Sequence, residues 1–327
     1  MISVVCPFYN ESSIIEAAIG RMLNVLETIP EDWELIVVND GSLDNSWDLA
    51  RSFSHPRLKV AGYPVNRGRG FALQHGMVLA NGDVIVTTEI DCSWGDDIVH
   101  RIVETLRSDS AVDMVIASPN LAGGGYYNVP RKRVLVSKIG NMLLRLTLNA
   151  SLTMYTGMTR GYRREMILSL PLDEPEKEFH LEVARKALAF NWNIVEVPAK
   201  LVWRDSLLMA SRSEKRKSSS NVKKLIRTHL LFSVIAAPAK YIFPISATSA
   251  IIATIFLTIS VTNFLMGSPS AFYLLTSLLI YVFSLLVMIA AILTHQNISI
   301  QTELWRVRME LRKGEKRPVN DEVSLRK

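Results

Sequence analysis

Short apolar runs alternate with amphipathic stretches over the first two hundred residues. Runs rich in β-branched residues, typical of buried strands, occur at 3–6, 34–38, 58–61, 84–88 and 114–117. Between them, the spacing of apolar positions predicts helices at 13–29, 46–53, 70–80 and 97–108. Strands that alternate with amphipathic helices predict an α/β fold, with a mainly parallel sheet and helices on both faces.

The C-terminal third has a different pattern. Between Lys240 and Glu303 there are 62 consecutive residues without Asp, Glu, Lys or Arg. One membrane crossing needs about 20 apolar helical residues, so this run is long enough for two. We therefore expect a two-helix transmembrane hairpin, with spans at 242–266 and 271–294 and an uncharged turn at 267–270. So long a charge-free run argues against a hairpin buried in a soluble core.

Charge is divided unevenly along the chain. Residues 1–210 contain 21 Lys and Arg against 25 Asp and Glu, whereas residues 211–327 contain 16 against 6. Cations flank the predicted hairpin on both sides and none lies in its turn, which predicts both ends of the hairpin in the cytoplasm. Met1 leads directly into a strand-like run without a basic segment, so we expect no secretory signal and a cytoplasmic N-terminal domain.

We divide the chain into four parts. These are a cytosolic domain at 1–210, a basic linker and interfacial helix at 211–241, two transmembrane helices at 242–294 and a basic cytosolic tail at 295–327. The segment 225–241 mixes basic and apolar residues and is interrupted by Pro238, which favours a helix in the headgroup layer. The alternative is that the first spanning helix begins early. The run 212–217 would also attract anionic lipid headgroups.

Composition narrows the classes of protein. An apolar content of 49% excludes a disordered chain. The two cysteines, Cys6 and Cys92, allow at most one disulfide and no cysteine-rich zinc cluster. We expect a membrane partner and no nucleic-acid partner. Paired spanning helices often associate, so a homo-oligomer is a further expectation.

Polar residues collect where the predicted strands end. Pro7, Tyr9, Asn10 and Glu11 follow the first strand, and the segment 39–44 follows the second. Ligands of parallel sheets bind at the carboxyl ends of the strands. The first of these turns has no G-x-G-x-x-G sequence, which argues against a dinucleotide-dependent oxidoreductase.

Two carboxylates follow the fourth predicted strand. Glu89 and Asp91 are two residues apart, and an extended chain directs such residues to the same side. Together with the Ser93 hydroxyl, they suit Mg²⁺ or Mn²⁺, which would complete its shell with substrate phosphates. A nucleotide-diphosphate sugar as donor and a lipid as acceptor would use the acidic residues, the metal site and the membrane helices together.

Four segments, in order, resemble the motifs of family 2 glycosyltransferases, which have the Rossmann-like GT-A fold. They lie at 4–11, 37–44, 66–70 and 89–91. The resemblance covers about residues 1–204, and within the family it is greatest to dolichol-phosphate mannose synthases and bacterial polyprenyl-phosphate glycosyltransferases. Segments 159–163 and 178–182 are similar to the Thr-Ser-Gly-Phe-Arg and Phe-x-x-Glu motifs of the family. The processive polysaccharide synthases of this fold are disfavoured, because no Gln-x-x-Arg-Trp occurs.

The resemblance implies roles for individual residues. The nucleotide sugar would be bound by Pro7, Tyr9, Asn10, Glu11, Asp40, Gly68, Glu89 and Asp91. The metal would be bound by Glu89, Asp91 and Ser93. The acceptor phosphate would be bound by Arg131, Arg133, Ser137 and Arg204. The catalytic residues would be Asp91, Arg133 and Arg204.

The sequence also departs from the family pattern. Glu89 stands where the first metal-motif Asp is usual, and Gly157 stands where the family generally has Asp. The Gly and Ser-Lys that usually follow Arg204 are absent. An attacking sugar hydroxyl needs a carboxylate base, but a phosphate monoester does not, because its second pKa lies near 6. Loss of the Asp at Gly157 is therefore tolerable for a phosphate acceptor and harmful for a hydroxyl acceptor.

The resemblance thus implies an inverting hexosyltransferase at the cytosolic membrane face. It would transfer one hexose from a GDP- or UDP-sugar to dolichyl or undecaprenyl monophosphate. One alternative is transfer to a lipid hydroxyl, as in diacylglycerol or ceramide, for which Asp96, Asp97 and Glu182 are the candidate bases. Another is a non-catalytic membrane-tethered protein that binds nucleotide sugars.

Overall fold

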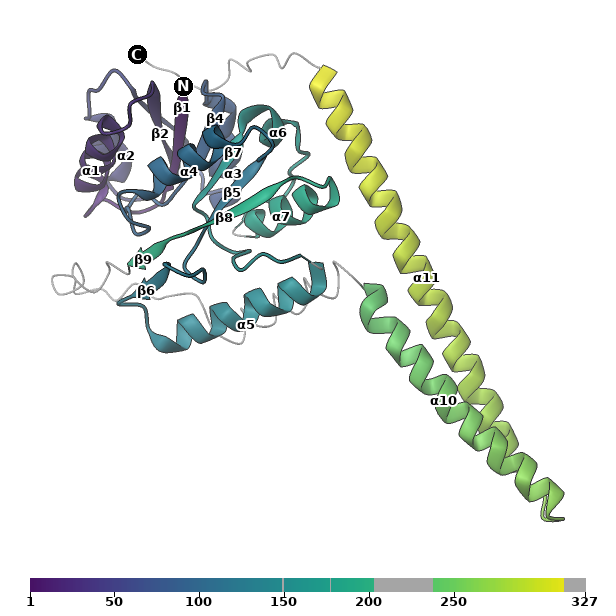
Figure 1. The fold of residues 1–327 in the computed structure, drawn as a ribbon. Coiled ribbons are helices and arrows are strands. Elements are labelled where there is room, and N and C mark those ends of the chain that lie inside the picture. Colours follow the sequence, from purple (N-terminus) through teal and green to yellow (C-terminus); the bar gives the residue numbers. More distant parts are fainter. Residues whose placement is uncertain (149, 177, 203–237, 315–327) are drawn as a thin grey trace. The chain divides into compact units, whose positions relative to one another are not determined.

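The computed structural model describes residues 1–148, 150–176, 178–202 and 238–314 (Figure 1). They divide into two compact units, and each is described by itself. The first contains the sheet and its helices. The second contains α10 (Pro238–Leu265), most of α11 (Ala271–Gly314) and the last residues of α5 (Arg131–Leu148).

A seven-stranded sheet forms the core of the first unit, with the order β3-β2-β1-β4-β7-β5-β8. Its strands are β1 (Ile2–Phe8), β2 (Trp33–Asp40), β3 (Leu58–Tyr63), β4 (Val84–Thr87), β5 (Met114–Ser118), β7 (Arg160–Arg163) and β8 (Ile194–Pro198). All neighbours are parallel except β7, which is antiparallel to both β4 and β5. The mainly parallel sheet is confirmed, and β7 is an element that the sequence pattern did not predict.

Helices and a second small sheet complete the first unit. The helices besides α5 are α1 (Ile15–Glu27), α2 (Ser46–Arg51), α3 (Arg69–Leu79), α4 (Ile98–Ser108), α6 (Arg164–Ser169) and α7 (Phe179–Ala189). The first four of these match the predicted helices to within a few residues. Strands β6 (Gly125–Tyr127) and β9 (Lys200–Val202) form a separate parallel pair.

Helices cover both faces of the large sheet. Gly161 lies in the same row across the sheet as Val4, and a Cβ at Gly161 would lie 2.2 Å from Cγ2 of Ile102, so α4 rests on this face. Val5 points to the other face, where a Cβ at Gly76 of α3 would lie 2.4 Å from its Cγ1. The two glycines thus let α3 and α4 approach opposite faces closely.

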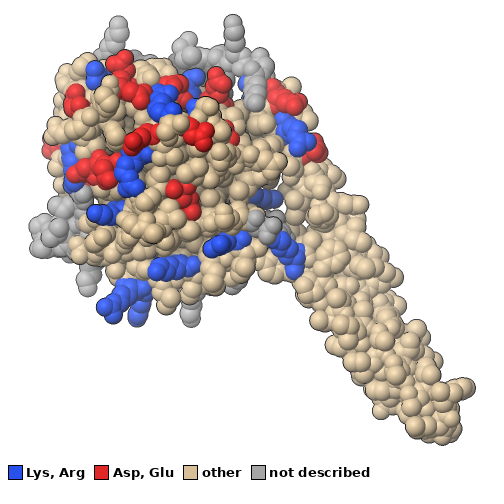
Figure 2. All heavy atoms as spheres, in the orientation of Figure 1, with Lys and Arg blue, Asp and Glu red and all other residues tan. Residues whose placement is uncertain are grey.

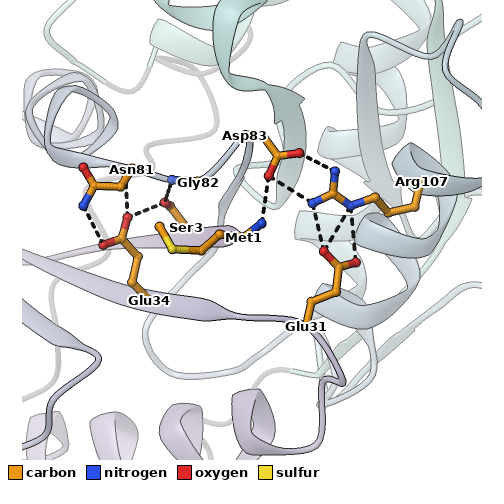
Figure 3. A network of polar contacts seen from close by, with 8 residues as sticks. All are labelled: Met1, Ser3, Glu31, Glu34, Asn81, Gly82, Asp83 and Arg107. Atoms are coloured by element: carbon orange, nitrogen blue, oxygen red, sulfur yellow. Dashed lines mark hydrogen bonds and ion pairs between the residues drawn. The ribbon is translucent and has the colours of Figure 1, made fainter.

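A polar network occupies the amino ends of the strands, opposite the edge where ligands are expected (Figure 3). Glu34 of β2 is buried and accepts hydrogen bonds from Ser3 Oγ (2.5 Å) and the Asn81 N–H (2.6 Å). Lys59 lies 2.6 Å from it. Burial alone would raise the pKa of Glu34, but the bonds from Lys59, Ser3 and Asn81 outweigh it and lower that pKa.

The same edge carries a network of charged groups. Arg107 of α4 forms ion pairs with Glu31 and with Asp83, and the Met1 amino group lies 3.0 Å from Asp83. The hydrogen bonds from Arg107 hold the pKa of Asp83 well below its ordinary value. These contacts join the segments that precede β1, β2 and β4.

We expect Asp83→Asn to lower the free energy of unfolding by about 1 kcal/mol at neutral pH, a small value because the carboxylate is partly solvated. A lowered pKa means that the ionised form stabilises the fold above the ordinary pKa of aspartate. This contribution is lost as the pH falls through the lowered value. Urea titrations of the full chain in detergent, at several pH values, would measure it. Glu104→Gln on α4, the helix that contains Arg107, is the control. Equal stability of Asp83→Asn and wild type at neutral pH would contradict the expectation.

The second unit contains two helices long and apolar enough to cross a membrane. Ser246 Oγ donates to the Ser284 carbonyl (2.9 Å) and Ser284 Oγ donates to the Ser246 carbonyl (2.8 Å). Small residues allow spanning helices to approach closely, and hydroxyl bonds hold them together. Gly267, with φ +76°, lies in the turn between them.

The helices occupy the predicted places but have different ends. The described part of α10 runs from Pro238 to Leu265, and α11 continues past residue 294 to Gly314. Hydropathy predicts only the part of a helix that can lie in lipid, and the helix can continue beyond that part. Most of the predicted interfacial helix at 225–241 lies outside the described residues, and its last four residues belong to α10.

Candidate active site

The loops that follow β1 and β2 are hydrogen-bonded to each other. Asn10 Oδ1 accepts the Leu43 N–H (2.8 Å), and the Asn10 N–H donates to Ser42 Oγ (3.0 Å). The Glu11 N–H donates to Ser46 Oγ (2.7 Å). Asn10 has φ +54°, a left-handed conformation that asparagine tolerates better than most residues. The structure thus brings the predicted residues Asn10 and Glu11 to the carboxyl end of β2.

Pro7 and Tyr9 lie beside these loops. Pro7 is the penultimate residue of β1 and pairs with Val38 of β2. Tyr9 follows the strand and is exposed, as a side chain available to a ligand must be. Both predicted residues are therefore at the carboxyl edge of the sheet.

Asp40, the last residue of β2, organises the segment that leads into α3. Its Oδ1 accepts hydrogen bonds from the Tyr63 hydroxyl (2.7 Å), the Arg67 N–H (3.0 Å) and the Gly68 N–H (3.1 Å). Its Oδ2 accepts one from Asn66 Nδ2 (3.0 Å). Gly68 has φ +95°, which only glycine adopts readily. Asp40 and Gly68 lie together, and both oxygens of the carboxylate hold this loop in place.

The two predicted metal ligands share a neighbour in the loop after β4. Ser93 Oγ donates to Glu89 Oε2 (2.7 Å), while the Ser93 N–H donates to Asp91 Oδ1 (3.0 Å). Trp94 Nε1 also donates to Glu89 Oε2 (2.8 Å). Both carboxylates therefore lie around Ser93. Trp94 is a site residue that the sequence analysis missed, because no motif marked it.

The residues present fit a hard divalent cation. Among the described residues, no group of three or more His, Cys, Asp or Glu could hold a metal ion by itself. Glu89 and Asp91 supply carboxylate oxygens, which suit an ion that takes its other ligands from a diphosphate and water. Glu89 Oε2 accepts two hydrogen bonds and Asp91 Oδ1 accepts one, so both candidate ligands are held in place by neighbouring donors. The Ser93 hydroxyl directs its proton to Glu89.

A loop at 153–158 lies against Trp94 of the acidic loop and is held by two polar side chains, the half-buried Glu196 and the buried Asn141. Glu196 of β8 accepts hydrogen bonds from the N–H groups of Thr153 and Met154, each at 2.8 Å. Asn141 of α5 accepts one from the Tyr155 N–H (2.7 Å). Burial raises the pKa of Glu196 in spite of these bonds. Long-range contacts thus fix a segment without regular structure.

Arg160 of β7 holds the other end of this loop. Its side chain is fully buried and donates to the carbonyls of Gly157 (2.8 Å) and His180 (2.9 Å), and also to that of Tyr155. Burial lowers the pKa of the guanidinium. Arg160 is therefore a positioning residue that the sequence analysis named only as part of a motif.

Gly157 lies against the acidic loop. A Cβ at this position would be 3.2 Å from Cγ of Met154 and 3.4 Å from the Trp94 ring. The position at which the resembling family generally has an aspartate is thus next to Trp94, whose indole donates to the candidate ligand Glu89, and here it presents no side chain. Met154 and Trp94 fill the adjacent space.

The predicted acceptor residues divide between two sides of α5. Arg133 and Ser137 precede the buried residues Asn141 and Leu144 at helical spacing, so they share its inward side and are half-buried. Arg131 is exposed. Arg204 lies outside the described residues. The last residue described before it, Val202, donates its N–H to the Ser93 carbonyl (2.7 Å), so β9 ends at the acidic loop.

The carboxylates considered as alternative bases have other partners or positions. Asp96 receives a two-nitrogen hydrogen bond from Arg21, with a shortest distance of 2.6 Å. Glu182 accepts backbone N–H groups and pairs with Lys186 at 2.6 Å. Asp97 is exposed at the start of α4. Within the described chain, the atoms nearest to a Cβ at Gly157 belong to Met154 and Trp94 and to none of these three.

Comparison with known proteins is consistent with this site. The family model for "Glycosyl transferase family 2" matches residues 3–170, just over half of the chain. The chain belongs to glycosyl transferase family 2. The matched range contains the strands β1–β5 and β7, the acidic loop and Gly157, so this family 2 domain includes the candidate site except β8, β9 and the segment that follows.

The names of two curated relatives of this family 2 protein include a lipid phosphate. Over 149 residues it is 32% identical to the dolichol-phosphate mannosyltransferase of Pyrococcus furiosus. This match covers 45% of this chain and 41% of that protein. Over 176 residues it is 31% identical to the undecaprenyl-phosphate 4-deoxy-4-formamido-L-arabinose transferase of Pectobacterium atrosepticum, covering 52% and 50%. The matches thus span half or less of each relative's length.

Solved structures confirm the fold. Glucosyl-3-phosphoglycerate synthase from Mycobacterium tuberculosis, in complex with Mn²⁺, uridine diphosphate and phosphoglyceric acid, superposes with a TM-score of 0.53 at 20% identity. The match covers 72% of this chain and 78% of that one. At this identity the likeness establishes the architecture of the family 2 domain and nothing about its ligands.

Proposed function

We propose that this protein transfers one hexose from a nucleotide-diphosphate sugar to a polyprenyl monophosphate, with inversion. The observation that carries the proposal is Gly157, which lies against Trp94 and offers no carboxylate at the position where a base would be expected. The names of the two relatives, which pair a sugar transfer with a dolichol or undecaprenyl phosphate, support the same class of acceptor.

The acceptor class follows from proton chemistry. A lipid hydroxyl must lose a proton to attack, and it needs a base within hydrogen-bond reach. Asp96 forms an ion pair with Arg21, and Glu182 forms one with Lys186. Asp97 is exposed and directly precedes α4. A phosphate monoester is already anionic at neutral pH and needs no base. The hydroxyl-acceptor reading is therefore disfavoured.

The residues of the site would act mainly by positioning and electrostatics. Asp91 and Glu89 would hold Mg²⁺ or Mn²⁺, which when bound stabilises negative charge on the departing diphosphate. Arg133 and Ser137, on the inward side of α5, would hold the acceptor phosphate, together with Arg204. The loops that contain Tyr9, Asn10, Glu11 and Asp40 would orient the nucleotide.

The membrane arrangement is part of the proposal. The candidate spans α10 and α11 would anchor the chain, with the family 2 domain and both termini in the cytoplasm. The flanking cations, which lie on both sides of the hairpin and not in its turn, support this orientation. The boundaries at residues 210, 241 and 294, and self-association through the spans, also remain proposals.

A donor and acceptor screen tests the function. The full chain in detergent, with Mg²⁺ or Mn²⁺, is given labelled GDP- and UDP-sugars with undecaprenyl phosphate, dolichyl phosphate, diacylglycerol or ceramide. We expect an acid-labile lipid product from the phosphates only. At subsaturating acceptor, the rate should rise as the acceptor loses its second proton near pH 6, with no later rise from a protein base. Product from the hydroxyl lipids would refute the acceptor assignment, and no product from any pair would favour a binding protein.

A further inference from the structure

Trp94 is a buried aromatic residue of the acidic loop. It is 3% exposed, and its Nε1 donates to Glu89 Oε2 over 2.8 Å. Glu89 is half-buried, so little water competes for this bond. A hydrogen bond to an ionised carboxylate is about twice as strong as one between neutral groups. The indole therefore restricts the directions in which the Glu89 carboxylate can point.

Neutral donors, and not cations, hold Glu89. Figure 2 shows acidic and basic side chains interspersed on the surface of the first unit, and ion pairs such as Arg21 with Asp96 are of this kind. Among the described residues, Glu89 has no ion pair, and its side chain accepts hydrogen bonds from the Ser93 hydroxyl and the Trp94 indole. Such donors orient a carboxylate without cancelling its charge, so the charge is left for an added cation.

Two other segments fix the position of the Trp94 ring. The carbonyl of the preceding residue, Ser93, accepts the Val202 N–H of β9 (2.7 Å). In addition, a Cβ at Gly157 would lie 3.4 Å from Cη2 of the ring and 3.2 Å from Cγ of Met154. An aspartate at this position, as the resembling family generally has, would extend beyond its Cβ into this filled space. The ring fits against the loop at 153–158 because residue 157 is glycine.

Trp94 thus lies against both positions at which this region departs from the family pattern. Glu89 is one methylene longer than the usual Asp, and the additional bond rotation gives its carboxylate more positions to occupy. An outer group that fixes a ligand in advance raises the affinity for a metal. We propose that Trp94 is the positioning residue that adapts the candidate metal site to a glutamate. Its N–H holds the Glu89 carboxylate where it can bind Mg²⁺ or Mn²⁺, and this role rests on the metal site of the proposed function.

Mn²⁺ binding in the absence of turnover tests this role. The full chain in detergent is titrated with Mn²⁺ in the presence of UDP or GDP and without a lipid acceptor, and the free ion is measured by electron paramagnetic resonance. Trp94→Phe keeps an aromatic ring but removes the N–H. We expect the Kd for Mn²⁺ to rise about tenfold in this variant, as is usual when an outer hydrogen bond to a ligand is lost.

Trp33→Phe is the matched control. Trp33 lies at the start of β2, is 2% exposed, and its Nε1 has no hydrogen-bond partner among the described residues. Its replacement removes an indole N–H of similar burial that holds no carboxylate. The Kd for Mn²⁺ should therefore stay at the wild-type value, and a similar loss in both variants would overturn the proposal.

A second background separates positioning from packing. Glu89→Asp withdraws the carboxylate by one methylene from the Trp94 N–H. Trp94→Phe should then change the Kd by less than about twofold, because the bond that it removes is already lost. Equal losses of about tenfold in the two backgrounds would show that Trp94 acts only by packing, which would refute its positioning role.

A measurement on the wild-type protein does not depend on the stability of the variants. We expect the nuclear magnetic resonance signal of the Trp94 indole N–H to shift when Mg²⁺ is added in the presence of UDP or GDP, because its acceptor becomes a metal ligand. The signal of the Trp33 indole should not shift. An unmoved Trp94 signal in protein that binds the metal would contradict the role of Trp94.

The failure of the metal site and the failure of the Trp94 role are distinguishable. If wild type bound no Mn²⁺ with either nucleotide, the metal site of the proposed function would fail, and the role of Trp94 with it. If wild type bound Mn²⁺ and Trp94→Phe bound it equally well, only the role of Trp94 would be rejected.

Discussion

Replacing Asp91 by Asn is expected to lower turnover by about a thousandfold or more, with little change in thermal stability. Asn retains an oxygen that can accept the Ser93 N–H, now 3.0 Å from Asp91 Oδ1, so the loop should keep its shape. It loses the negative charge through which Asp91 would hold Mg²⁺ or Mn²⁺. Initial rates against metal concentration, with a thermal melt of each protein, would measure both effects.

Asp97→Asn is the matched control for this experiment. Asp97 lies on the same connection between β4 and α4 and is exposed, and its ion pair within the described residues is with Arg101 at 3.6 Å. We expect near wild-type transfer from this variant. A wild-type rate for Asp91→Asn at every metal concentration would show that the assignment of Asp91 is wrong.

Replacing Arg133 by Ala is expected to raise the KM for polyprenyl phosphate by about a hundredfold, because a charge-assisted hydrogen bond to phosphate would be lost. The KM for the donor should change little, since the nucleotide would be bound by the loops that follow β1 and β2 and not by α5. Arg133→Lys should restore part of the loss, because it retains the charge without the paired donors. Steady-state kinetics with each substrate varied in turn would separate the two effects.

Arg101→Ala provides the comparison, because Arg101 lies on α4 and its ion pair within the described residues is with Asp97. It should leave both KM values unchanged. If Arg133→Ala altered the two KM values equally, or neither, the acceptor role of Arg133 would be rejected and α5 would have to be assigned another purpose.

Local pattern was sufficient for the first half of the sheet. β1 and β2 are almost fully buried, so their apolar runs are long and unmistakable. β7 could not be found in this way. It has four residues, and its Arg160 is a fully buried cation held by carbonyls from the loop at 153–158 and from α7. Its identity as a strand depends on β4 and β5, which lie far from it in the sequence.

The candidate site was also predicted only in part, where its signals are local in the sequence. Glu89 and Asp91 were found because a strand end and a spacing of two are local signals. Glu196 and Asn141, which hold the loop that carries Gly157, gave no signal because their bonds join elements 14 to 43 residues apart. Trp94 gave no signal either, because its indole belongs to the site only through its hydrogen bond to Glu89.

The place of β7 has a consequence for synthesis of the chain. β4 and β5 emerge from the ribosome before β7, yet neither can pair with the other, because β7 lies between them. Until residue 163 has emerged, the nascent protein holds a sheet fragment of β3, β2, β1 and β4 with an open edge at β4, and a separate strand β5; such open edges invite pairing with other chains. A truncated form that stops before β7 should therefore aggregate, and a soluble fragment should extend at least through β8.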